Sequence, residues 1–197
     1  MNKKSISVQK EGSLMNKDLR VIKTEELIQK SLIFLLQQQS IEKLTVKDIC
    51  AYAKIGRSTF YAHYMDKFDV LEKIIKTYSD SFDKLIQQRF SKNEVSESIQ
   101  SIAKDITKKK TEIQTLFNSP YNHYNLEKSF LLILRKHCAL YIETSSKYKQ
   151  FNLPLTFMID LYTSSAMTMI HYSLNNELSD NIFDFLQYLS DYGLKKA

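Results

Sequence analysis

The chain has 197 residues, with 28 Lys and Arg against 22 Asp and Glu and a formal net charge of +6. Only three Gly and two Pro interrupt it, which favours helices over strands, and three scattered glycines exclude a phosphate loop or a dinucleotide fingerprint. The excess of positive charge lies in residues 1–76, which hold 14 Lys and Arg against 9 Asp and Glu, as expected of a region that approaches phosphates.

The N-terminal part of the chain predicts a tail followed by one helix. Residues 1–16 are polar and lack periodicity, which favours a disordered tail over an arm that contacts DNA, and Met15 could also be the true start. Residues 17–39 carry apolar side chains at helical spacing and predict an amphipathic helix. Its apolar positions are Val21, Ile28, Leu32, Leu35 and Leu36.

Residues 45–65 predict two short helices joined by a tight turn. Thr45 and Asp48 have the spacing of a capping box, in which each side chain accepts a backbone N–H at the start of the helix. Gly56 can cap a second helix that runs from residue 57 to about residue 64. Phe60 and Tyr64 lie four residues apart and can point inward. The exposed side chains would then be polar and suited to a groove: Arg57, Ser58, Thr59, Tyr61 and His63.

This segment resembles the helix-turn-helix of TetR-family transcriptional regulators over about residues 20–71. The matching positions are Thr45, Asp48-Ile49, Thr59-Phe60-Tyr61, His63-Tyr64, Lys67 and Val70-Leu71. The chain departs from the family at Lys54, where Gly is usual, and at Gly56, where Ser is commoner. If Lys54 takes the left-handed conformation of the turn, the strain is about 1–2 kcal/mol.

The resemblance implies a set of contacts with double-stranded DNA. We expect Arg57 to meet base edges or adjacent phosphates, and Ser58 and Thr59 to reach bases or backbone. The residues expected to hold phosphates are Thr45, Tyr61, His63 and Lys67. Without the motif, these polar side chains would be read as an ordinary solvated helix face.

The remainder of the chain predicts more helices. Asp66 can cap a long helix whose apolar residues continue at three- and four-residue steps to about Ile86. Further helices are expected over residues 99–106, 112–117, 125–145, 155–174 and 179–192. The predicted fold class is therefore all-α. A helix-turn-helix domain at residues 17–65 would be joined by the long helix to an effector-binding and dimerisation domain at residues 66–197.

The last two predicted helices suggest a homodimer. Residues 155–174 are apolar almost all round, and such a helix must be covered on every side. A second copy of the chain would complete a four-helix interface about a two-fold axis, as in TetR-like dimers, although a well-buried core pair would also explain the pattern. The expected interface residues are Met167, Ile170, Phe183 and Tyr188.

Aromatic residues distributed over the C-terminal helices suggest a pocket for a small-molecule effector. The alternative is that they fill an ordinary core, and His137 is as well explained by a hydrogen bond in that core. The expected pocket residues are Tyr78, Phe82, Phe117, Tyr121, Phe130, His137, Tyr141, Phe157 and Tyr162.

Other classes of protein find little support. The four histidines lack zinc-ligand spacing and there is no Cys-x-x-Cys pair, so we expect no metal, no cofactor and no enzyme activity. Cys50 and Cys138 fit small buried side chains in a reducing compartment. No signal-peptide core or bilayer-length run occurs, which predicts a cytoplasmic protein without a membrane partner.

The hypothesis is a DNA-binding regulator, by default a repressor of a palindromic operator released by a small molecule. The alternative is a TetR-like co-regulator that acts through a protein partner.

Overall fold

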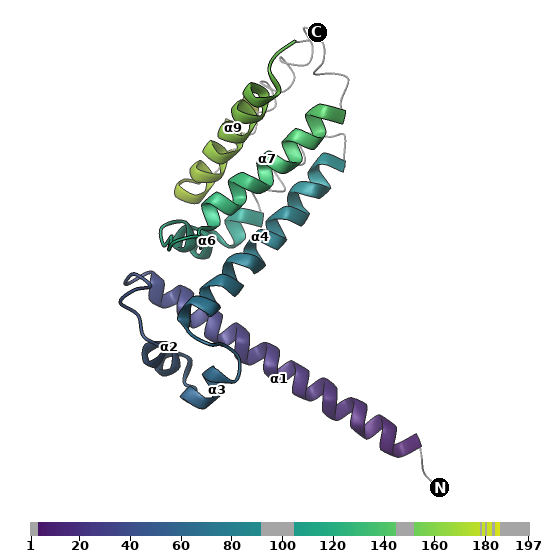
Figure 1. Ribbon diagram of the computed structural model, residues 1–197, viewed down its shortest axis with the longest axis vertical. Coiled ribbons are helices and arrows are strands. Elements are labelled where there is room, and N and C mark those ends of the chain that lie inside the picture. Colours follow the sequence, from purple (N-terminus) through teal and green to yellow (C-terminus); the bar gives the residue numbers. More distant parts are fainter. Residues whose placement is uncertain are drawn as a thin grey trace. The chain divides into compact units, whose positions relative to one another are not determined.

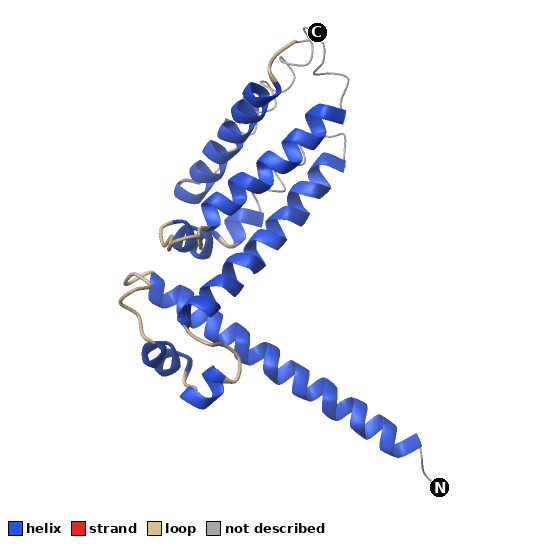
Figure 2. Ribbon diagram, in the orientation of Figure 1, coloured by secondary structure: helices blue, strands red, loops and turns tan. Residues whose placement is uncertain are grey.

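The structure, a computed structural model, describes residues 4–91, 105–144 and 152–177, together with residues 179, 181, 182, 184 and 185. Every regular element in these ranges is a helix, as Figure 2 shows, and the all-α prediction is confirmed. The helices are α1 (Lys4–Leu36), α2 (Val46–Ala53), α3 (Arg57–Tyr61), α4 (Lys67–Ser91), α6 (Lys110–Phe117), α7 (Leu126–Thr144) and α9 (Leu155–Asn175), labelled in Figure 1. None of those described is both long and apolar enough to cross a membrane.

The chain divides into two compact units, residues 1–74 and 75–197, and the division falls within α4. Each unit has its own buried core. Sequence alone had placed the domain boundary earlier, at residues 65 and 66, where α4 is about to begin.

The first unit contains α1, α2, α3 and the first part of α4 (Figure 1). Ile28 and Leu32 of α1 are fully buried, as their helical spacing predicted. Other fully buried side chains of this unit are Ile49, Phe60, Val70, Leu71 and Ile74. The backbone of α1 begins at Lys4, whereas the sequence pattern predicts a tail over residues 1–16. Lys, Gln and Glu in that stretch are good helix formers even without an apolar stripe.

Helix α4 begins as the sequence predicted. Oδ1 of Asp66 accepts hydrogen bonds from the backbone N–H groups of Phe68 and Asp69, at 2.8 and 2.9 Å. These bonds satisfy N–H groups that have no partner within the helix. The helix then continues to Ser91, so the prediction of one long helix at this position is confirmed.

The second unit contains the remainder of α4 with α6, α7 and α9, and α7 and α9 run side by side (Figure 1). The rings of Phe82 on α4 and Phe130 on α7 are stacked with centroids 3.8 Å apart. A second cluster joins Cys138 and Ile142 of α7 to Ile159 of α9. The helix expected over residues 99–106 lies mostly outside the described residues. The same is true of much of the one expected over 179–192, including Phe183 and Tyr188.

Candidate nucleic-acid interface

The start of α2 is fixed by the predicted capping box. The hydroxyl oxygen of Thr45 accepts the N–H of Asp48 at 3.2 Å, and Oδ2 of Asp48 accepts the N–H of Thr45 at 2.9 Å. The Thr45 hydroxyl also donates its proton to Asp48 at 2.6 Å. These bonds hold the pKa of Asp48 below its usual value, the side-chain bond from Thr45 being the largest cause. Thr45 is exposed, but its single proton already points to Asp48.

The turn between α2 and α3 has the left-handed residue that the sequence suggested. Lys54 has φ 53° and ψ 42°, and its N–H bonds back to carbonyl groups of α2. Gly56 follows with φ −75° and ψ 154°, a conformation open to any residue, and provides the N-cap of α3 without a side chain. The strained position of this turn is therefore occupied by a lysine, and the glycine beside it is not required by backbone geometry.

Helix α3 is short and is anchored by one ring. Phe60 is 0% exposed and lies edge-on to Tyr61, with centroids 5.5 Å apart. The other side chains of α3, Arg57, Ser58, Thr59 and Tyr61, are exposed to solvent. The sequence predicted that this helix would end at about residue 64, but α3 ends at Tyr61. The N–H groups of His63 and Tyr64 still bond to the carbonyl of Phe60.

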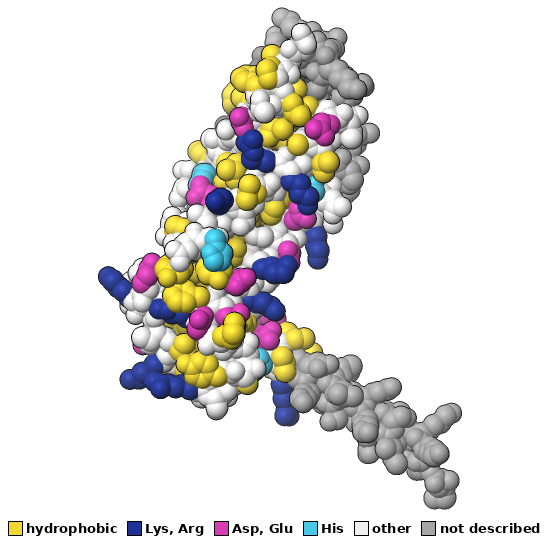
Figure 3. Space-filling model, viewed as in Figure 1, with side chains coloured by type: hydrophobic (Ala, Val, Ile, Leu, Met, Phe, Trp, Pro, Cys, Tyr) yellow, Lys and Arg dark blue, Asp and Glu magenta, His cyan; other side chains and the backbone are white. Residues whose placement is uncertain are grey.

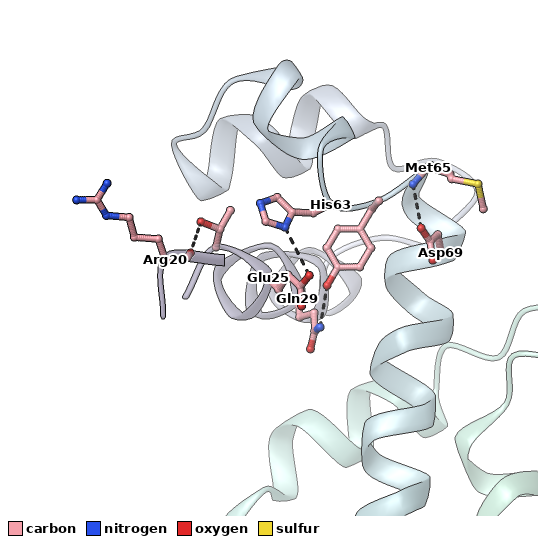
Figure 4. Close-up of polar contacts among 8 residues, drawn as sticks. Arg20, Glu25, Gln29, His63, Met65 and Asp69 are labelled. Carbon is pink, nitrogen blue, oxygen red and sulfur yellow. Dashed lines mark hydrogen bonds and ion pairs between the residues drawn. The ribbon is translucent and has the colours of Figure 1, made fainter. Parts of the chain in front are cut away.

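The chain that follows α3 is held against α1 by two side-chain contacts, shown in Figure 4. Nε2 of Gln29 donates to the Tyr64 hydroxyl at 2.8 Å, and Nδ1 of His63 lies 3.5 Å from Oε1 of Glu25. Burial raises the pKa of Tyr64, so its hydroxyl stays protonated. His63, expected to bind phosphate, is half-buried and faces α1, where it fixes the position of α3.

Lys67 is also engaged within the protein. Its Nζ donates to the carbonyl oxygens of Glu42 at 2.9 Å and Leu44 at 2.6 Å, which ties the first residue of α4 to the segment before α2. The ammonium group has three N–H bonds, so one remains for a phosphate. Of the expected DNA contacts, the structure thus leaves Arg57, Ser58, Thr59 and Tyr61 fully presented. Thr45, His63 and Lys67 hold the geometry.

Exposed lysines that the motif did not single out as contacts add positive charge near these residues. Lys43 and Lys47 are exposed before and within α2, and Lys54 is exposed in the turn. Figure 3 shows dark blue Lys and Arg side chains at the border of the part occupied by α2 and α3. Their signal in the sequence was the N-terminal excess of positive charge rather than any spacing.

A separate cavity of about 250 Å³ lies in the second unit. Three residues expected in the effector pocket line this cavity: Tyr78, Phe82 and Phe130. The other lining residues are Ser81, Leu85, Asp105, Ile106, Lys108, Lys109 and Ile113. The hydroxyl of Tyr78 donates to Oε2 of Glu112 at 2.6 Å, and Nζ of Lys109 lies 5.0 Å from the centroid of the Tyr78 ring.

The remaining residues expected in the pocket lie elsewhere in the second unit. Phe117 is buried edge-on to Phe130, outside the cavity lining. Nε2 of His137 lies 2.8 Å from Oδ1 of Asp83, which supports the core interpretation of this histidine. Tyr121 forms a bridge with its neighbour Tyr124, Tyr141 is half-buried on α7, and Tyr162 packs on the Cys138 cluster. Phe157 is 52% exposed, so it faces solvent instead of a pocket.

The residues of α9 expected at a dimer interface pack within the single chain instead. Met167 is 8% and Ile170 5% exposed, so neither is available to a second copy in this arrangement. The apolar side chains that α9 exposes are Phe157, Leu161 and Tyr172. Helical periodicity could not separate the two faces, because the helix is apolar on both.

The described residues contain no cluster of three or more His, Cys, Asp and Glu side chains that could hold a metal ion.

No model of a protein family matches the sequence. A stretch of 67 residues is 31% identical to an uncharacterised HTH-type transcriptional regulator of Bacillus subtilis. This match covers 34% of the chain, and the chain spans only 18% of the length of that relative.

Two solved structures resemble the chain over most of its length. A TetR transcriptional regulator from Streptococcus agalactiae is 27% identical, with a TM-score of 0.56, 89% of this chain covered and 96% of that one. The dihydroxyacetone kinase operon activator DhaS is 17% identical, with a TM-score of 0.56 and coverages of 88% and 97%, and this likeness concerns the fold alone. Together with the capped α2, the turn at Lys54 and the anchored α3, the first of these likenesses shows that the chain is similar in fold and in its helix-turn-helix to TetR-type transcriptional regulators.

Proposed function

We propose that this protein is a regulator that binds a palindromic site in double-stranded DNA as a homodimer, represses transcription there and releases the DNA when a small-molecule effector binds. The observation that carries the proposal is the surface of α3. Phe60 is fully buried, while the residues on both sides of it are exposed and polar. A helix this short contributes little to a core beyond one ring, and its presented side chains have the chemistry of groove readers.

Arg57 is the strongest candidate for reading a base. It is the first residue of α3 and is exposed, and a guanidinium can bond two acceptors of guanine at once. Ser58, Thr59 and Tyr61 would add contacts to bases or backbone. Lys47 and Lys54 would approach phosphates, because their exposed ammonium groups lie on the same motif.

Two copies of α3 are needed because one presents few side chains. In a dimer they would read successive major grooves about 34–36 Å apart on one face of DNA. The exposed stripe of α9 supports such a dimer. Phe157, Leu161 and Tyr172 lie on one side of the helix, with the smaller Ser165 and Thr168 between them. Figure 3 shows yellow hydrophobic surface in the part occupied by α7 and α9. Apolar surface of this kind marks an interaction site.

The dimer can be tested with a charge placed on the stripe. Leu161→Glu should yield a monomer in light scattering coupled to gel filtration and should weaken DNA binding, because a buried carboxylate would lack a partner. Thr156→Glu adds the same charge at an exposed position of α9 beside the stripe and should stay dimeric. A Leu161→Glu variant that remains a dimer would assign the interface to another surface.

DNA recognition can be tested by selecting bound sequences from a random duplex pool and measuring affinity for the enriched site across salt concentrations. A palindrome should be enriched, and affinity should fall steeply as salt rises. Arg57→Ala should weaken binding to that site by about 1–3 kcal/mol and relax the preference at one base pair. Lys84→Ala removes the same charge from an exposed site in the second unit and should bind as the parent does. Unchanged sequence preference in Arg57→Ala would reassign that residue to the phosphate backbone.

Helix α4 gives a physical route for effector control. Lys67, its first residue, is bonded to the segment before α2, and Tyr78 and Phe82 of the same helix line the cavity. An effector would need different affinities for the DNA-bound and released states, equivalent to a coupling of about 1–3 kcal/mol. A ligand of the cavity that leaves DNA affinity unchanged would contradict this part of the proposal.

A further inference from the structure

The cavity beside α4 is specific enough to suggest the chemistry of its ligand. We propose that it binds a small aromatic carboxylate, with the ring on the apolar floor and the carboxylate at the ammonium group of Lys109. This inference rests on the effector-controlled function proposed above and names the class of effector. It depends on the cavity's size, its floor and the charges at its edge.

The size of the cavity suits one ring with a small substituent. Its volume is about 250 Å³. A closed apolar cavity of about 150 Å³ is enough to take benzene. The extra space accommodates a carboxylate or a group of similar size, but the cavity is smaller than the pockets of about 300–1,000 Å³ that hold drug-sized ligands.

The floor of the cavity is apolar. Phe82 and Phe130 are stacked on each other and buried, and both line the cavity. Leu85, Ile106 and Ile113 complete this part of the lining. An aromatic body gains from burial here, because aromatic and aliphatic side chains are both favourable neighbours for a ring.

Among the residues that the structure describes, Lys109 at the edge of the cavity has no counter-ion. Lys108 is paired with Asp105 at 2.8 Å, which uses both charges. Lys109 is exposed and forms no ion pair among the described residues, and its Nζ lies over the face of the Tyr78 ring. Lys109 can therefore turn toward an incoming anion without breaking an ion pair, and its charge would repel a cationic ligand.

Tyr78 and Glu112 are hydrogen-bonded to each other beside the cavity. The Tyr78 hydroxyl donates to Oε2 of Glu112, so this carboxylate already has a donor. Burial, and then the contact with Glu112, raise the pKa of Tyr78, so the hydroxyl stays protonated and carries no charge. Glu112 itself is not among the residues that line the cavity. Among the lining residues, the positive charge of Lys109 thus remains unbalanced.

Three probes with the same ring separate the charges: benzoate, benzyl alcohol and benzylamine. Their dissociation constants for the full-length protein can be measured by ligand-observed NMR. We expect benzoate to bind most tightly and benzylamine most weakly. Lys109→Gln should weaken benzoate binding about tenfold and leave benzyl alcohol nearly unchanged, because only the charged contact is lost. Lys108→Gln is the matched control, since Lys108 is paired with Asp105, and it should have the smaller effect.

A third variant tests the location. Leu85 lines the cavity and is half-buried, so Leu85→Trp can extend into the cavity and should prevent benzoate binding. Circular dichroism should show all three variants as helical as the parent, because the substituted residues are exposed or half-buried.

Three results would overturn the inference: equal or tighter binding of benzylamine, no effect of Lys109→Gln on benzoate, or no binding of any of the three probes. None of them bears on DNA recognition, which is measured separately with Arg57→Ala. Conversely, Lys109-dependent binding of benzoate by a protein without DNA affinity would keep this inference and refute the regulator.

Discussion

Different kinds of contact hold the helices in place within each of the two units of the molecule. In the first unit, caps between residues close in sequence, such as Thr45 with Asp48, begin α2 and α4, and longer-range bonds of Lys67 and Tyr64 add to them. In the second unit, several polar contacts join side chains on different helices: Tyr78 to Glu112, Asp83 to His137 and Glu127 to His171. The first kind of contact can be read from a short stretch of sequence and the second cannot.

Removing the ring that anchors α3 should have the largest effect. Phe60→Ala should destabilise the first unit by about 3–5 kcal/mol, because a fully buried ring is replaced by a cavity. Denaturant unfolding, followed by circular dichroism, measures this loss. Tyr61→Ala is the neighbouring control: its ring is 58% exposed, so its stability should change by about 0.5 kcal/mol or less. Similar stabilities for both variants would show that α3 does not depend on Phe60.

Breaking a tie between helices tests the second unit. Asp83→Ala removes the carboxylate that bonds His137 and should cost about 1–2 kcal/mol of unfolding free energy at neutral pH. Lys136→Gln alters a more exposed contact with the same carboxylate, so we expect about 0–1 kcal/mol there. A larger loss for Lys136→Gln than for Asp83→Ala would place the main tie at the surface.

The same tie predicts a pH dependence. The hydrogen bond with His137, more than the contact with Lys136, holds the pKa of Asp83 below its usual value. A depressed carboxyl pKa stabilises the fold above the unfolded-state value of about 3.9, and the contribution is lost as pH falls through the folded-state pKa. The unfolding free energies of the parent and Asp83→Ala should therefore converge in acid. A difference that stayed constant to low pH would assign the effect to packing.

The turn at Lys54 offers a gain in stability. Lys54→Gly should stabilise the first unit by about 1 kcal/mol, because glycine takes a positive φ without the clash of a Cβ atom. Lys47→Gly makes the same change inside α2 and should destabilise, since glycine is a poor helix former. Midpoints of thermal unfolding distinguish the two, and a loss of stability in Lys54→Gly would mean that its side chain contributes more than the strain costs.

The smallest expected effect is at Gly56. A Cβ atom there would lie 3.6 Å from Oγ of Ser58 and 3.9 Å from Oγ1 of Thr59, which are ordinary contacts. Gly56→Ser should raise stability by about 0.5–1 kcal/mol, through a side-chain cap for α3 and a less flexible unfolded chain. Gly56→Ala supplies only the second contribution, so its melting temperature should rise less. Equal rises would mean that the serine hydroxyl does not cap α3.

The sequence predicted the parts of the fold whose causes are local. The capping box at Thr45, the left-handed turn at Lys54 and the cap at Asp66 were each visible within a few residues, and all are confirmed. The inward position of Phe60 followed from helical spacing in the same way. Local signals also set the starts and ends of helices, which is why α4 and α9 were located closely.

The sequence could not predict contacts between distant residues. Nothing near His63 or Lys67 indicates that they would meet Glu25 and the carbonyl of Leu44, so both were expected to face DNA. The effector pocket stays a prediction, because aromatic residues in a core and in a cavity wall have the same periodicity and sequence alone cannot separate them. Of the residues expected in the effector pocket, Tyr78, Phe82 and Phe130 line the cavity. Nothing in the sequence indicated that Lys108 and Lys109 would line it as well.

The hydrogen bonds of Lys67 connect the start of α4 directly to the segment before α2. The ammonium group of Lys67 donates to the carbonyl of Leu44. Leu44 directly precedes Thr45, which caps the start of α2. In the proposed function, a small rotation at the start of α4 would move the segment that begins α2, and with it the turn that leads to Arg57. If the protein acts as proposed, weakening the Lys67 bonds should uncouple effector binding from DNA affinity, while the protein can still bind both ligands.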